Sequence, residues 1–134
     1  MWRNAPDVLP MLRTGYKTEA EQAAFYRDVV SNPRSNHWYY ALEHDAQFVG
    51  MGGLTYLGRT KGEAEISLIL GPEFRGKGLG HASVEALLTE ARRLGISAVV
   101  GECLPTGNIG FWVREILASP RAVYMEPLCW RWTL

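Results

Sequence analysis

Apolar and polar residues follow two different periods along this chain, and the change between them is clearest from Glu63 to Gly95. Residues 65–70 read Glu-Ile-Ser-Leu-Ile-Leu, a short and largely apolar run that predicts a strand. Gly-Pro-Glu-Phe at 71–74 ends this strand, because proline cannot donate a hydrogen bond to a sheet. Beyond residue 80, apolar positions recur every three or four residues, which predicts a helix with one apolar face. These positions are Val84, Leu87, Leu88, Ala91 and Leu94.

Weaker patterns predict the elements on either side. Thr18 and Glu21 have the spacing of a capping box, which starts a helix that runs to about residue 30. The residues of this helix expected to face the core are Ala24, Phe25, Tyr26 and Val29. The other predicted elements are a short helical turn at 7–12, strands at 37–42 and 47–57, a buried central strand at 96–103, a loop at 104–107, a helix at 108–117, and strands at 122–125 and 128–133, or one strand broken at Pro127. Glycines at 50, 52 and 53 predict a bulge or a close backbone approach.

A turn rich in glycine and positive charge joins the central strand to the helix. It reads Arg75-Gly76-Lys77-Gly78-Leu79-Gly80. Glycine at every second position removes the Cβ atoms that would keep a ligand away from the backbone N–H groups. These groups lie at a helix N-terminus, where unpaired donors and the helix dipole favour an anion, and Arg75 and Lys77 add positive charge. The turn therefore predicts a phosphate or pyrophosphate site; the alternative is a surface turn that only starts the helix.

Two common phosphate motifs do not match this turn. A dinucleotide fingerprint has the spacing G-x-G-x-x-G, and here the third glycine comes one residue early, with His81 in its place. A P-loop requires G-x-x-x-x-G-K-[ST], which the chain does not contain. The predicted anion site is therefore neither a Rossmann nor a P-loop site.

The turn resembles the [QR]-x-x-G-x-[GA] acyl-CoA signature of the GNAT superfamily of N-acetyltransferases. Residues 64–70, with Pro72 and Glu73, resemble that superfamily's fourth strand and the following turn, and the resemblance spans roughly residues 37–112. It implies an α/β (α+β) GNAT fold in one domain over residues 1–134, with a mixed central sheet of about six strands and flanking helices.

The N-terminal segment carries a second part of the resemblance. Trp2-Arg3-Asn4, Pro6 and Val8 resemble a segment on the first helix of the ribosomal-protein and nucleotide-sugar branches of GNAT proteins. The family's first strand is therefore expected to be missing here. A missing strand would leave a sheet edge open to covering loops, to a second copy of the chain or to a protein partner.

The GNAT resemblance implies that acetyl-CoA is the co-substrate and suggests its contacts. The phosphates would bind the turn, that is Arg75, Gly76, Lys77, Gly78, Leu79 and Gly80. In GNAT proteins the fourth and fifth strands diverge and hold the pantetheine arm, which here would contact backbone groups of Leu68, Ile69 and Leu70. Asn108, which follows an acidic strand end at Glu102, would contact the pantetheine or a water on it, and it is equally suited to cap the next helix.

Glu65 is the predicted general base. Alternation places it on the same face of the strand as Ser67 and Ile69, and it matches the glutamate that serves as base in some GNAT proteins. A carboxylate with an ordinary pKa of about 4.3 could act through a water, or the apolar strand could raise its pKa. The alternatives are that Glu65 is solvated or ion-paired, and that its neighbour Glu63 is the base.

The resemblance fails at the general acid. Many GNAT proteins have a tyrosine seven residues after the asparagine, as the acid for the departing thiolate, and this chain has Glu115 there. Tyr124 is the nearest substitute, although a tyrosine in a terminal strand is more often a packing residue. His81 is predicted either to touch a phosphate or to lie in solvent.

Composition argues against several other classes. Lysine plus arginine and aspartate plus glutamate both number 14, so the net charge is zero, which argues against a nucleic-acid binder. Cys103 and Cys129 are the only cysteines, and their spacing indicates neither a metal site nor a disulfide framework. The sequence has no apolar leader and no run of membrane-spanning length, so a soluble, cytoplasmic protein is expected.

These features together predict an N-acetyltransferase that moves an acetyl group from acetyl-CoA to a primary amine by direct attack in a ternary complex. The acceptor could be a small molecule, an amino sugar or a protein amine, because acceptor pockets vary within one fold. The alternative from another class is a catalytically weak or inactive GNAT-like protein that acts by binding another protein.

Overall fold

The structure, a computed structural model, describes residues 4–7, 9, 16–56, 62–103, 108–119, 122–126 and 129–134. Its helices are α1 (Glu19–Phe25), α2 (Leu79–Arg93) and α3 (Ile109–Ala118), with a π-helical turn η3 (Tyr26–Val30) and a 3₁₀ turn η4 (Pro72–Phe74). Its strands are β1 (His37–His44), β2 (Gln47–Tyr56), β3 (Glu63–Leu70), β4 (Ala98–Glu102), β5 (Ala122–Glu126) and β6 (Cys129–Thr133). No described helix is long and apolar enough to cross a membrane.

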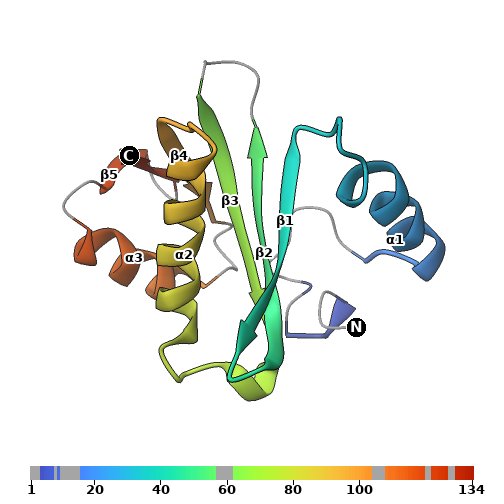
Figure 1. Ribbon diagram of the computed structural model, residues 1–134. Coiled ribbons are helices and arrows are strands. Elements are labelled where there is room, and N and C mark those ends of the chain that lie inside the picture. The colour runs from blue at the N-terminus through green and yellow to red at the C-terminus, as the bar shows by residue number, and fades with distance from the viewer. Residues whose placement is uncertain are drawn as a thin grey trace.

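The described strands form one six-stranded sheet in the order β1-β2-β3-β4-β6-β5 (Figure 1). Neighbouring strands are antiparallel except for β3 and β4, which run parallel. β4 therefore lies inside the sheet, and its residues Ala98 and Val99 are fully buried, as the apolar run at this point predicts. The mixed sheet with flanking helices confirms the predicted fold class.

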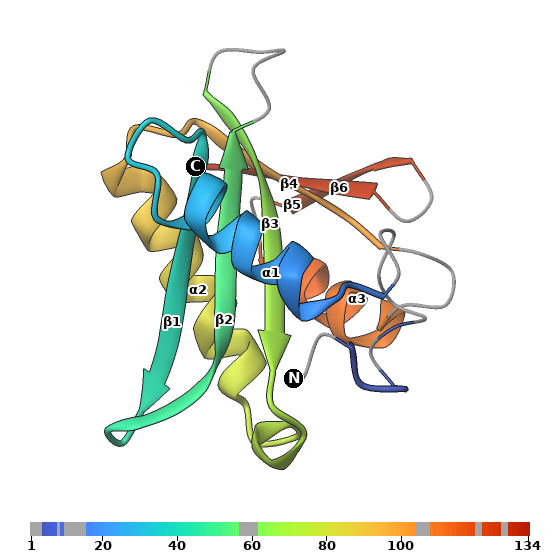
Figure 2. The same ribbon diagram turned by 90° about the vertical axis from the view of Figure 1, so that its right-hand side faces the viewer.

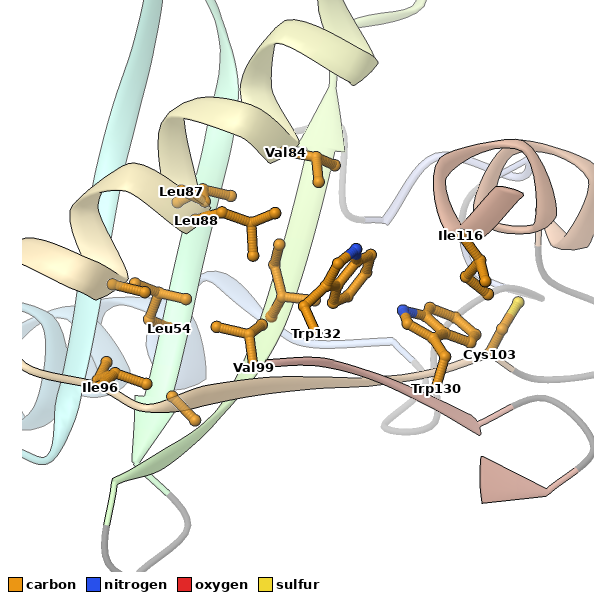
Figure 3. Packing of buried hydrophobic residues seen from close by; sticks show 13 residues of the cluster. Leu54, Val84, Leu87, Leu88, Ile96, Val99, Cys103, Ile116, Trp130 and Trp132 are labelled. Carbon is orange, nitrogen blue, oxygen red and sulfur yellow. The ribbon is translucent and has the colours of Figure 1, made fainter. Parts of the chain in front are cut away.

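Helices α2 and α3 cover one face of the sheet, and α1 lies on the other (Figures 1 and 2). Leu54 of β2 lies beneath α2 in the buried core (Figure 3). Ala64 and Ile66 of β3 belong to the same core. The α2 residues in the same core are Val84, Leu87, Leu88 and Ala91. Burial of a valine or leucine side chain stabilises a fold by about 1.5–3 kcal/mol, so this apolar stripe holds α2 on the sheet.

Indole rings continue the core between α3 and β6 (Figure 3). The ring centroid of Trp112 lies 5.2 Å from that of Trp130, which lies 6.1 Å from that of Trp132. Gly101 of β4 makes room for Trp130, because a Cβ there would lie 2.5 Å from its ring. The indole N–H of Trp130 is buried without an acceptor in the described part of the chain, which costs about 1–3 kcal/mol.

The first helix begins as predicted and then departs from its period. The capping box is confirmed, since the Thr18 hydroxyl accepts from the Glu21 N–H at 3.2 Å and the Glu21 carboxylate accepts from the Thr18 N–H at 2.8 Å. At Tyr26 the chain changes to π geometry, and Phe25 and Tyr26 are 45% and 62% exposed. Phe25 nevertheless faces the sheet, since its ring centroid lies 5.5 Å from that of Tyr39 on β1 in an edge-to-face contact. The expectation that Tyr26 faces the core is wrong, because the i→i+5 bonding that begins at Tyr26 breaks the 3.6-residue period.

The glycines of β2 fulfil both of their predicted roles. The partners of Leu42 and Glu43 on β1 are Gly50 and Phe48, which leaves Val49 as an extra residue in a bulge. A Cβ at Gly52 would lie 2.9 Å from Leu87 of α2, so this glycine allows the helix to approach the strand.

Two strands, rather than one broken strand, end the chain, since β5 and β6 pair antiparallel. The predicted loop at 104–107, most of the predicted turn at 7–12, and Leu57 lie outside the described residues. Among the described strands, β1 and β5 form the two edges of the sheet.

Candidate functional site

The turn between β3 and α2 opens toward solvent at two glycines. Gly76 and Gly78 have φ angles of +71° and +80°, which residues with a Cβ rarely adopt. A Cβ at either position would meet no atom within 4 Å. Gly78 is also the N-cap of α2 and supplies no side chain to cap it. At these two positions the chain presents bare backbone, as the sequence predicts.

The backbone N–H groups of residues 76–81 have no acceptor in the described part of the chain. The bond that closes the start of α2 runs from the Ala82 N–H to the Gly78 carbonyl, at 3.2 Å. The first turn of α2 contains no acidic residue, so no side chain of that turn offsets the positive end of the helix dipole. These donors are available to an anion from outside the chain.

Gly80 has a packing role. A Cβ at Gly80 would lie 2.8 Å from the ring of Phe111 on α3. The missing Cβ of the third alternating glycine therefore makes room for Phe111, and the contact of the Gly80 backbone with a phosphate stays a prediction. Its small size lets the first turn of α2 approach α3.

Arg75 and Lys77 differ in their partners. The Arg75 guanidinium donates to the Leu70 carbonyl at 3.1 Å and pairs with the Asp7 carboxylate. The hydrogen bond from Arg75 holds the pKa of Asp7 below its usual value. Lys77 is exposed and forms no ion pair within the described residues. Arg75 therefore ties the turn to the end of β3, while Lys77 remains available to an anion.

Strands β3 and β4 separate toward the turn. They pair only over residues 63–65 and 98–100 among the described residues. Beyond that point β3 continues to pair with β2, where Leu68, Ile69 and Leu70 lie opposite residues 52, 51 and 50. About half of the N–H and C=O groups of a strand point to each side, so this stretch of β3 presents backbone groups to an edge with no described strand beside it. Leu68, Ile69 and Leu70 therefore lie on a stretch of β3 with no described strand on one side, where the Leu70 carbonyl already accepts from Arg75; their contact with a pantetheine arm stays a prediction.

Glu65 lies where the two strands part. It is the last β3 residue that pairs with β4, opposite Val100. Its neighbours Ala64 and Ile66 are buried on the α2 side, so the Glu65 side chain, like that of Ser67, points to the opposite face of the sheet. The competing base, Glu63, forms an ion pair with Arg131 of β6. The Glu63 carboxylate is therefore engaged by Arg131, and the role of Glu65 as general base stays a prediction.

The sheet face that carries Glu65 is polar. Thr55 of β2 lies directly opposite Glu65, and its hydroxyl lies 3.1 Å from Nδ1 of His37 on β1. Two residues from Glu65 along β3, Ser67 lies opposite Gly53 of β2. A Cβ on Gly53 would lie 2.6 Å from the Ser67 hydroxyl and 2.9 Å from the ring of Tyr39 on β1. Polar side chains from three neighbouring strands thus surround the position of Glu65 on the side of α1.

The comparison with protein families agrees with this geometry. The family model of the acetyltransferase (GNAT) domain matches residues 1–110. The chain belongs to the GNAT acetyltransferase family. Among curated proteins, none matches the chain significantly.

Solved structures share the GNAT fold of this chain. Spermidine N-acetyltransferase from Vibrio cholerae, in complex with CoA and spermine, has a TM-score of 0.78 at 14% identity, covering 93% of this chain and 73% of that one. Aminoglycoside acetyltransferase AAC(6')-Ib, in complex with coenzyme A, has a TM-score of 0.76 at 16% identity, covering 98% and 85%. A domain from Methanocaldococcus jannaschii has a TM-score of 0.71 at 16% identity, covering 99% and 86%. At these identities the likeness shows the fold alone.

The remaining predicted GNAT residues lie at two different places. Asn108 is the N-cap of α3, and its side-chain oxygen accepts from the Phe111 N–H at 3.2 Å, so its capping role is confirmed and its pantetheine contact stays a prediction. The backbone of Tyr124 lies in β5 opposite Trp130, and its side chain is outside the described part. β6 separates β5 from β4, which places the Tyr124 backbone about 10 Å from β4 at ordinary strand spacing. Its role as an acid stays a prediction.

The sequence did not reveal a pair that joins the two helices of this GNAT domain. His81 Nδ1 lies 2.8 Å from Glu115 Oε2. The Glu115 side chain on α3 is buried, with 8% exposure, whereas that of His81 on α2 is 54% exposed. The hydrogen bond and the charge of Glu115 raise the pKa of His81 above its usual value. The two residues are 34 positions apart, and no local pattern connects them.

Proposed function

We propose that this chain transfers an acetyl group from acetyl-CoA to a primary amine by direct attack in a ternary complex. The observation that carries the proposal is the run of N–H groups at 76–81 without acceptors in the described chain, placed at the end of the strand from which β4 separates. Membership of the GNAT acetyltransferase family supports the reaction class.

The turn and the open edge of β3 fit the two halves of such a co-substrate. The N–H groups of residues 76–81, with Lys77, would hold the pyrophosphate, because unpaired donors at a helix N-terminus favour an anion. From Leu70 back to Glu65 the strand spans about 17 Å at 3.4 Å per residue, along which an extended pantetheine arm would lie. The thioester would then lie near Glu65, at the point where the strands part.

The chemistry needs a neutral amine and a polarised carbonyl. Glu65, directly or through a water, would take a proton from the acceptor ammonium, and the amine nitrogen would attack the thioester carbon. A backbone N–H on the open edge of β3 would stabilise the oxyanion. The carbon–sulfur bond then breaks, the attacking nitrogen gives up its second proton to water and becomes an amide, and the thiolate takes a proton to leave as the free thiol. Tyr124 remains the candidate donor of that last proton.

The polar face beside Glu65 is the proposed path for the acceptor. His37, Tyr39, Thr55 and Ser67 supply hydroxyl and imidazole groups there, which suit an amine that also carries hydroxyl or further amino groups. Two proteins of the same fold are named for spermidine and aminoglycoside acetylation, and both of these acceptors are amines. These observations support a primary amine acceptor without choosing between a small molecule, an amino sugar and a protein amine.

Thiol release from acetyl-CoA with a panel of amines tests this proposal, after the rate without acceptor is subtracted. Glu65→Gln should lower kcat by about 10²–10⁴-fold, the usual contribution of a general base, and leave the Kd for CoA unchanged. Glu43→Gln, at an exposed position of β1, is the matched control and should keep full activity. Full activity in Glu65→Gln would remove Glu65 from the mechanism. Binding of CoA without thiol release for any amine, together with a co-purifying protein, would favour the GNAT-like binding protein.

A further inference from the structure

His81 stands at the start of α2 beside the backbone proposed to bind pyrophosphate. It is the third residue of α2, and the open glycine Gly78 is the N-cap of the same helix. Its Nδ1 is bonded to Glu115 on α3, while the side chain as a whole remains more than half exposed. Gly80 and Phe111 pack one residue away, so the first turn of α2 contacts α3 through both a polar and an apolar pair.

Glu115 favours the charged form of His81. A buried carboxylate is stable only when it is paired, and the bond to His81 supplies a partner. The charged groups that act on the imidazole are Glu115 on α3 and Glu85 one turn along α2, while Lys77 and Arg75 precede it in the sequence of the turn. Both carboxylates raise the pKa of His81, and Arg75 is already paired with Asp7.

Nε2, the second ring nitrogen of His81, is the donor that the bond to Glu115 leaves available. An imidazolium donates from both nitrogens, and no described residue bonds to Nε2. A cation in the first turn of a helix is disfavoured by the helix dipole. Since that turn also lacks an acidic residue, a bound anion would offset the positive charge there better than any side chain of the turn does.

We infer that His81, held and charged by Glu115, is a further contact for the pyrophosphate and makes its affinity depend on pH. The inference rests on the proposed function of the turn. His81 is then a binding residue and Glu115 a positioning residue. Because the imidazolium binds the anion, affinity is highest below the pKa of His81 and falls as the pH rises through it. Between the pKa of His81 in the free protein and its higher pKa in the complex, binding takes up a proton.

The probe is 3′-dephospho-CoA, because the 3′-phosphate of CoA itself titrates near a pH of about 6 and would mask the effect. Its Kd is measured by calorimetry from pH 5.5 to 8.5, in pairs of buffers that differ in ionisation enthalpy. The parent protein should lose about tenfold in affinity across this range, the size of one charge-assisted hydrogen bond. Because the buffer supplies the proton that is taken up, the measured binding enthalpy should differ between the two buffers of each pair.

Three variants separate His81 from the rest of the site. His81→Gln should bind 3′-dephospho-CoA about tenfold more weakly than the parent protein at low pH and equally well at high pH. Its affinity should lack the decrease with pH that is assigned to His81. Glu115→Gln should shift the midpoint to lower pH while keeping the low-pH affinity, which a merely structural role would not do. Lys77→Met should weaken binding at every pH and keep the midpoint of the parent protein.

Two results would overturn the inference while leaving the proposed function intact. One is tight binding with no pH step in the parent protein, and the other is a step that survives in His81→Gln. If Glu115→Gln does not fold, the exposed His81→Gln variant and the proton uptake of the parent protein still decide. Absence of binding by the parent protein to both CoA and 3′-dephospho-CoA would remove the proposed function and this inference together.

Discussion

Glutamate at Gly78 is expected to expel the co-substrate by putting a negative charge into its anion site. Gly78 has a φ of +80° and open space where a Cβ would stand, so the new side chain would project freely beside the N–H groups of residues 76–81. A carboxylate about 5 Å from a doubly charged pyrophosphate repels it by about 1.7 kcal/mol even at the dielectric constant of water. This is more than tenfold in Kd, so we expect Gly78→Glu to weaken CoA binding by at least about tenfold.

Gly95, at the other end of α2, provides a matched control. It has a φ of +78°, and a Cβ there would also meet nothing within 4 Å. Glutamate therefore brings the same charge and a similar backbone strain, about 1–2 kcal/mol, to both positions. Gly95→Glu should bind CoA like the parent protein. The helix dipole favours a carboxylate at Gly78 and disfavours it at Gly95, by about 0.3–1 kcal/mol each, so Gly78→Glu should be the more stable variant.

Calorimetric titration with CoA and thermal unfolding of both variants measure these two differences. Weakened binding in Gly78→Glu alone supports a pyrophosphate at the turn. Equal CoA affinity in the two folded variants would refute the reasoning, because the same charge would then act equally from both ends of α2. A less stable Gly78→Glu would contradict the assignment of unpaired N–H groups at the helix start.

Two further predictions concern the core and the pH dependence of stability. Gly101→Ala should lower the free energy of unfolding by about 1–3 kcal/mol, measured in urea, because its Cβ would lie 2.5 Å from the Trp130 ring; unchanged stability would mean that this ring has room to move. The Tyr40 hydroxyl donates to Glu90 at 3.1 Å, and burial and this bond raise the pKa of Tyr40 to about 12. Since the folded pKa lies above the usual value, this stabilisation is complete below a pH of about 10 and is lost as the pH rises toward 12. Tyr40→Phe should therefore show a smaller loss of stability over that range than the parent protein, and an equal loss would contradict the assignment.

The strand, turn and helix between Glu63 and Gly95 are predictable because their signals are local. Apolar spacing sets the buried face of α2, a proline ends β3, and glycines mark the turn. The capping box at Thr18 and the cap at Asn108 are local too, since each side chain bonds a backbone group three residues away. Such interactions are set within one turn of the chain, and all of these predictions are confirmed.

The misjudged features depend on contacts between distant parts of the chain. Gly80 resembles its two neighbouring glycines in sequence, yet the ring of Phe111 on another helix explains its small size. The sequence places the charge of Arg75 at the turn but gives no sign of its partner Asp7, which lies 68 positions away. The His81–Glu115 pair has the same character. Exposure of Tyr26 has a local cause, the change to π geometry, but hydrophobic periodicity in the sequence gives no signal for that change.

The narrow join between β3 and β4 has a mechanical consequence for the described part of the sheet. On each side of it, three strands form an antiparallel ladder, whereas the join itself consists of three residue pairs. The buried side chains of α2 and the tryptophans of β6 must therefore supply much of the contact that holds β1-β2-β3 to β4-β6-β5. A molecule lying in the gap would bridge them with backbone hydrogen bonds of its own. If the co-substrate binds there, it would connect the two halves of the sheet in addition to taking part in the reaction. The protein with bound co-substrate should then be more rigid than the free protein.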